Sequence, residues 1–79
     1  MIERVVGPFK GYYIASYACE MGELGERYLG FAKLCRVKPD DYWQASACAK
    51  FSCEELADTP EHALASAEAR ARMRRLRPL

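Results

Sequence analysis

The sequence predicts an α+β fold: a three-stranded antiparallel β-meander followed by one C-terminal α-helix packed on one face of the sheet (β-β-β-α). Three observations predict this. Two tyrosine-containing apolar segments flank a glycine turn, a third segment alternates apolar and polar residues, and an alanine-rich segment with a dense start signal closes the chain. We expect one domain over residues 1–79, and the 51% hydrophobic content excludes a disordered chain.

Residues 1–8 contain only one apolar patch. Val5 and Val6 form it, and the turn-forming pair Gly7-Pro8 follows at once. The segment is therefore predicted to be either an N-terminal arm or a short edge strand, which the sequence alone does not decide.

The sheet is expected to span residues 9–53. Residues 9–20 are rich in tyrosine and contain no proline, which favours a strand. Gly22 and Gly25 mark a turn, and residues 26–35 then form a second strand. The short connection predicts an antiparallel hairpin.

Both faces of this hairpin carry large apolar side chains. A turn centred on Glu23 pairs Tyr17 with Leu29 on one face, whereas Tyr12 pairs with Leu34 on the other. One helix covers only one face, so the second is either solvated or in contact with another copy of the chain. The residues predicted for self-association are Tyr12, Ile14, Tyr28 and Leu34.

The third strand is predicted over residues 42–53. A turn at residues 36–41 precedes it, because proline and aspartate at positions 39–41 favour a change of direction. Apolar residues then recur with a period of two. One side of this strand holds Trp43, Ala45, Ala47, Ala49, Phe51 and Cys53.

The helix is predicted over residues 58–77. Asp58 and Thr59 are alternative caps: Asp58 has capping-box spacing to Glu61, whereas Thr59 places Pro60 at the preferred first helical position. At 100° per residue, one stripe faces the sheet, and its small side chains let the helix lie close to the strands. It contains Ala63, Leu64, Ala67 and Ala71; a second stripe holds Ala65, Ala69, Met73 and Leu76.

The element order and the seven residues Asp58-Thr59-Pro60-Glu61-His62-Ala63-Leu64 resemble the HicB-like antitoxin domain. In that family a similar aspartate or serine, threonine, glutamate, alanine and leucine pattern opens the helix. The resemblance extends over residues 9–76 in order of elements. It implies a β-β-β-α fold and an antitoxin-like regulatory role.

Catalytic and metal-binding motifs do not stand out. The four cysteines, at positions 19, 35, 48 and 53, form no C-x-x-C pair and are interpreted as small buried hydrophobic residues. His62 is the single histidine, and Cys53 is the nearest candidate for a nucleophile beside it. We therefore expect a non-enzymatic protein with no cofactor, no metal and no small-molecule substrate.

The C-terminal arginines are the one concentrated charge, since the formal net charge is only +1. They either contact nucleic acid or a partner protein, or form a solvated helix end favoured by the helix dipole. The sequence shows no membrane-spanning run, and we expect a cytoplasmic protein that forms homodimers, with nucleic-acid binding as the alternative. The cluster comprises Arg70, Arg72, Arg74, Arg75 and Arg77.

Overall fold

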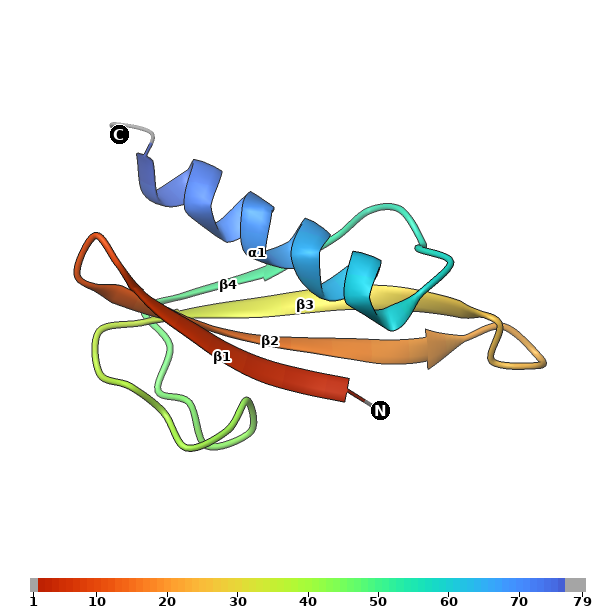
Figure 1. The fold of residues 1–79 in the computed structure, drawn as a ribbon, viewed down its shortest axis with the longest axis horizontal. Coiled ribbons are helices and arrows are strands. Elements are labelled where there is room, and N and C mark those ends of the chain that lie inside the picture. Colours follow the sequence, from red (N-terminus) through yellow and green to blue (C-terminus); the bar gives the residue numbers. More distant parts are fainter. Residues whose placement is uncertain (1, 77–79) are drawn as a thin grey trace.

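The computed structural model describes the backbone of residues 2–76 and the side chains of residues 2–73. It is an α+β fold with an antiparallel sheet in the order β1-β2-β3-β4 and one C-terminal helix, α1, across one face (Figure 1). The sheet has four strands where the sequence predicted three. The elements are β1 Ile2–Phe9, β2 Tyr12–Met21, β3 Arg27–Cys35, β4 Ala49–Ser52 and α1 Pro60–Leu76.

The additional strand is β1, which forms one edge of the sheet. Its sequence was predicted to be an arm or a short edge strand, and the edge-strand alternative is confirmed. The turn lies at Lys10-Gly11, where both residues have positive φ (51° and 82°) between the paired residues Phe9 and Tyr12. Two such residues make the tight hairpin that matches strand twist. Gly7-Pro8 lies inside β1, where the pairing shifts register.

The β2–β3 hairpin keeps its predicted faces with a different register. Tyr17 pairs with Phe31 rather than Leu29, and Ile14 pairs with Leu34. The difference is two residues. Because side chains alternate with a period of two, every residue stays on its predicted face.

The predicted third strand is correct only at its end. β4 contains four residues, and Tyr42 begins a turn rather than a strand. In Figure 1, the loop of residues 36–48 passes on the opposite side of the sheet from α1. Residues 42–48 alternate as a strand would, but they belong to this loop. Tyr42 and Trp43 pack from the loop against Tyr17 of β2.

Thr59, not Asp58, caps α1. The backbone N–H of His62 donates to the Thr59 hydroxyl at 3.1 Å, and Pro60 is the first helical residue. The helix thus begins two residues later than predicted, and Asp58 instead forms an exposed ion pair with Arg27. The predicted buried stripe is confirmed: Ala63, Leu64, Ala67 and Ala71 are all at most 2% exposed.

Gly30 of β3 sets how closely the helix lies on the sheet. A Cβ atom at this position would come within 2.2 Å of the Ala63 carbonyl oxygen and 3.2 Å of the Ala67 Cβ. The backbone of α1 therefore rests almost directly on the backbone of β3. Only glycine leaves room for this contact.

Candidate interaction surface

The face beneath α1 is a closed core. Ile14 and Leu34 are 0% and 6% exposed and pack against Ala67 and Ala71. This corrects the predicted self-association face, because its central side chains lie under the helix and cannot reach a partner. Tyr12 packs against the same cluster, and Tyr28 packs against the cluster around Leu64.

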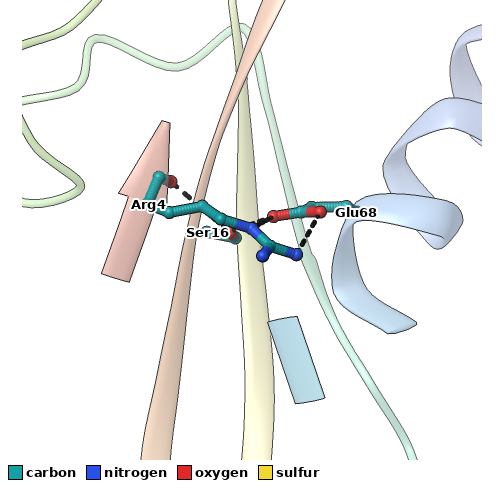
Figure 2. A network of polar contacts seen from close by, with 3 residues as sticks. All are labelled: Arg4, Ser16 and Glu68. Atoms are coloured by element: carbon teal, nitrogen blue, oxygen red, sulfur yellow. Dashed lines mark hydrogen bonds and ion pairs between the residues drawn. The ribbon is translucent and has the colours of Figure 1, made fainter. Parts of the chain in front are cut away.

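A buried polar network joins α1 to the first two strands. The Glu68 carboxylate, on a side chain only 4% exposed, accepts two hydrogen bonds from the Arg4 guanidinium, at 2.6 Å and 2.8 Å. The fully buried Ser16 donates a third at 2.7 Å. Figure 2 shows the Arg4 side chain extending towards the Glu68 carboxylate, with Ser16 next to both groups. Charge-assisted bonds of this kind explain how a carboxylate is accommodated under a helix, and they raise the pKa of Arg4.

A second set of polar contacts fastens the 36–48 loop to the other face. The Tyr42 N–H donates to the Glu3 carboxylate at 2.9 Å, and the Lys33 ammonium donates to the Tyr42 carbonyl at 2.8 Å. The Lys33 ammonium also lies 4.3 Å from the centre of the Tyr42 ring. Adjacent residues of β1, Glu3 and Arg4, therefore hold the layers on opposite sides of the sheet.

Beneath the loop, four aromatic rings form a cluster. Tyr17 lies at its centre, with ring centroids at 6.0 Å from Phe31, 5.4 Å from Tyr42 and 4.9 Å from Trp43. Tyr17 and Tyr42 are buried, but Trp43 is 58% exposed. The loop thus covers the middle of this face and leaves part of the cluster open to solvent.

The uncovered part of this face continues along the strands. Phe31 and Leu29 of β3 are half-buried, and Met21 at the end of β2 is 38% exposed. We call this surface, with Trp43, the open sheet face. Lys50 and Ser52 of β4 lie on the same side, opposite Lys33 and Phe31, and are exposed. The sequence indicated that a second apolar face exists but did not show which residues remain accessible.

An open groove of about 450 Å³ lies between α1 and the loop before it. Cys53 and His62, the pair considered for nucleophilic chemistry, both line it, together with Arg70 and Met73. Burial raises the pKa of the Cys53 thiol despite the opposing charge of Arg70. The protonated thiol is thus favoured at neutral pH, and the groove presents no activated thiolate.

The cysteines are spread over the fold. Cys35 is buried, Cys19 and Cys53 are half-buried, and Cys48 is exposed with its thiol donating to the Leu34 carbonyl at 3.2 Å. The interpretation of all four as buried hydrophobic residues is therefore wrong for Cys48. Within the described residues, no three histidine, cysteine or acidic side chains are grouped to hold a metal ion.

The structure places two side chains of the predicted arginine cluster. Arg70 forms an exposed ion pair with Glu54 at 3.6 Å, whereas the Arg72 guanidinium lies 5.6 Å from the centre of the Phe9 ring. These two residues therefore point to different neighbours. Arg74 and Arg75 belong to α1, but their side chains, like the whole of Arg77, lie outside the described residues.

Comparisons with protein families, curated proteins and solved structures give no match for this chain. The resemblance to the HicB-like domain thus stays a hypothesis based on the seven residues at the start of α1 and on the order of elements. Among the described residues, no helix is long and apolar enough to cross a bilayer.

Proposed function

We propose that this protein is a small non-enzymatic interaction module of the cytoplasm that forms homodimers through its open sheet face. The observation that carries the proposal is the 58% exposure of Trp43 on the same face of the sheet as the half-buried Leu29 and Phe31. Tryptophan and phenylalanine in such a patch are typical anchors of protein interfaces. The 36–48 loop presents Trp43 to solvent and covers Phe31 only in part.

Charge complementarity supports a second copy as the partner. Exposed carboxylates lie at the β2–β3 turn, where Glu23 and Glu26 are found, whereas Lys50 lies towards the other end of the face. A two-fold axis perpendicular to the strands would bring the acidic turn of one copy over Lys50 of the other. Opposite charges at the rim then favour this antiparallel arrangement.

The test is static light scattering over a concentration range from about 5 to 500 µM, where interfaces of modest size dissociate. We expect the apparent mass to rise from 9.0 kDa towards twice that value. Trp43→Ser and Lys50→Glu should both weaken association. Lys50 is exposed, so its substitution leaves the core intact.

Met73→Ser is the matched control, because Met73 is 61% exposed but lies on α1, on the other side of the sheet. It should associate like the wild type. A wild-type chain that stays monomeric throughout the range would contradict the proposal. Equal weakening by Met73→Ser would place the contact on the helix side instead.

A further inference from the structure

Arginines of the described region divide into two groups by partner. Three are engaged by carboxylates: Arg4 by Glu68, Arg27 by Asp58 and Arg70 by Glu54. The other two, Arg36 and Arg72, have no carboxylate partner among the side chains of residues 2–73. Each instead lies over an aromatic ring: Arg36 is 5.5 Å from the centre of the Tyr12 ring, and Arg72 is 5.6 Å from that of Phe9.

The two arginines converge on one end of the fold. Their supporting rings, Phe9 and Tyr12, are cross-strand partners at the β1–β2 turn, where side chains lie about 5 Å apart. The exposed Lys10 is in the turn that joins them. Segments distant in sequence thus bring Lys10, Arg36 and Arg72 together, and we call these three residues the basic end.

The opposite end of the molecule is acidic. Exposed glutamates at positions 20, 23 and 26 flank the β2–β3 turn, and the bridge between Tyr28 and Ala57 holds Asp58 near it. The longest dimension, 38 Å, is several times the Debye length of about 8 Å at physiological salt. A charged ligand near one end is therefore largely screened from the charges at the other, although the net charge of the chain is only +1.

We propose that the basic end binds the phosphate backbone of nucleic acid. Guanidinium groups resting on aromatic rings keep the edges with their N–H groups free, and these edges match phosphate oxygens in a bidentate way. Ring contact also holds the long side chains in place, so less conformational entropy is lost on binding. The acidic end repels a polyanion and orients the protein with its basic end towards it.

The experiment is a filter-binding titration of the full chain with labelled single-stranded and double-stranded oligonucleotides at 50 and 200 mM salt. We expect binding at 50 mM that weakens steeply at 200 mM. The double variant Arg36→Gln/Arg72→Gln should lose about tenfold in affinity at 50 mM, and its salt slope should fall by about 2 because two phosphate contacts are gone.

The matched control is Arg27→Gln/Arg70→Gln, which removes the same charge from arginines already paired with carboxylates. It should retain most of the affinity. Arg74, Arg75 and Arg77 are unchanged in both variants. Circular dichroism of each variant checks that the fold is kept.

Three outcomes would overturn the proposal. The first is no retention of either oligonucleotide at 50 mM salt. The second is an equal loss in the two double variants, which would make the effect one of total charge. The third is binding to vesicles containing phosphatidylserine, dependent on Arg36 and Arg72, without binding to oligonucleotides, which would assign the basic end to a lipid surface.

Discussion

The two faces of the sheet are covered in different ways. On one side, α1 packs alanines against β3 so closely that Gly30 is required, and Ala67 and Ala71 are fully buried. On the other side, an irregular loop places Tyr42 over Tyr17 and leaves Trp43 58% exposed. Close packing of α1 leaves Ala32 and Leu34 of β3 only 0% and 6% exposed, whereas the loop covers only what its few anchored side chains reach.

This difference predicts which substitutions each face of the sheet tolerates. The helix face is filled by small side chains in direct contact, so an added atom or an unpaired charge has no room to relax. The loop face uses large rings at a partly wet boundary, so a missing atom is replaced by water. We therefore expect substitutions on the helix face to cost folding stability, and those on the open sheet face to affect association more than stability.

The largest expected effect comes from Gly30→Ala. The new Cβ atom would lie 2.2 Å from the Ala63 carbonyl oxygen, so α1 must shift away from β3. We expect the free energy of unfolding to fall by about 3 kcal/mol or more, measured by urea denaturation. Ser52→Ala, at an exposed position on the opposite face, should stay within about 0.5 kcal/mol of wild type. A loss near 1 kcal/mol in Gly30→Ala would show that the helix packing adapts readily.

Arg4→Met should have the next largest effect. It leaves the Glu68 carboxylate, 4% exposed, with Ser16 as its hydrogen-bonding partner in the network, and we expect a loss of about 3 kcal/mol. Glu68→Leu should cost less, because the Arg4 side chain is 41% exposed and can turn to water. The double variant Arg4→Met/Glu68→Leu should be more stable than Arg4→Met alone. Strict additivity in this double-mutant cycle would contradict an ion pair that acts as a unit.

Trp43→Ala tests the loop face. The substitution removes ring contacts with Tyr17 and Tyr42, each worth about 0.5 to 1.5 kcal/mol, from a side chain already 58% exposed. We expect a loss of about 1 to 2 kcal/mol, smaller than for Gly30→Ala, measured by urea denaturation at a concentration where the chain is monomeric. A loss that matches Gly30→Ala would remove the distinction between the two faces.

The smallest effect concerns alkaline pH. Burial raises the pKa of the Cys35 thiol above its ordinary value of 9.0, so the folded state favours the protonated form. The resulting stability is fully present below pH 9 and is lost as pH rises through the folded pKa. Denaturant midpoints should therefore fall above pH 9, and the fall should be smaller in Cys35→Ala.

Cys48→Ser is the comparison variant, because the charge of Cys48 is a smaller cause of the raised Cys35 pKa than burial. It should therefore retain most of the alkaline fall. Burial also raises the pKa of Tyr42 from its ordinary value of 10.0, so a further loss is expected at higher pH on the loop face. An alkaline fall of equal size in Cys35→Ala and wild type would assign it to groups other than Cys35.

Local signals predicted much of the fold. The hairpin faces follow from side-chain alternation alone and survive a two-residue error in register. The buried stripe of α1 follows from helical periodicity. β1 was less clear because its turn, Lys10-Gly11, places a lysine at positive φ, where asparagine or aspartate is the usual signal.

The candidate surfaces depended on contacts between distant segments. The sequence indicated that one apolar face would stay uncovered, but it did not show that the 36–48 loop would bury Tyr42 and leave Trp43 accessible. It also grouped Arg70 with Arg72. In the fold the first is paired with Glu54, and the second lies by Phe9 near the basic end.

The sequence by itself determined the class of fold, the two faces of the central hairpin and the buried stripe of the helix. Each depends on residues close together in the sequence, through the side-chain period of two in a strand or 3.6 in a helix. Only the tertiary structure decided which face the helix covers and which arginines pair with carboxylates. Those outcomes depend on contacts between residues far apart in the sequence. Glu3, for example, contacts Tyr42 on one side of the sheet, and the adjacent Arg4 contacts Glu68 on the other. The basic end arises in the same way, since separate segments supply Arg36 and Arg72.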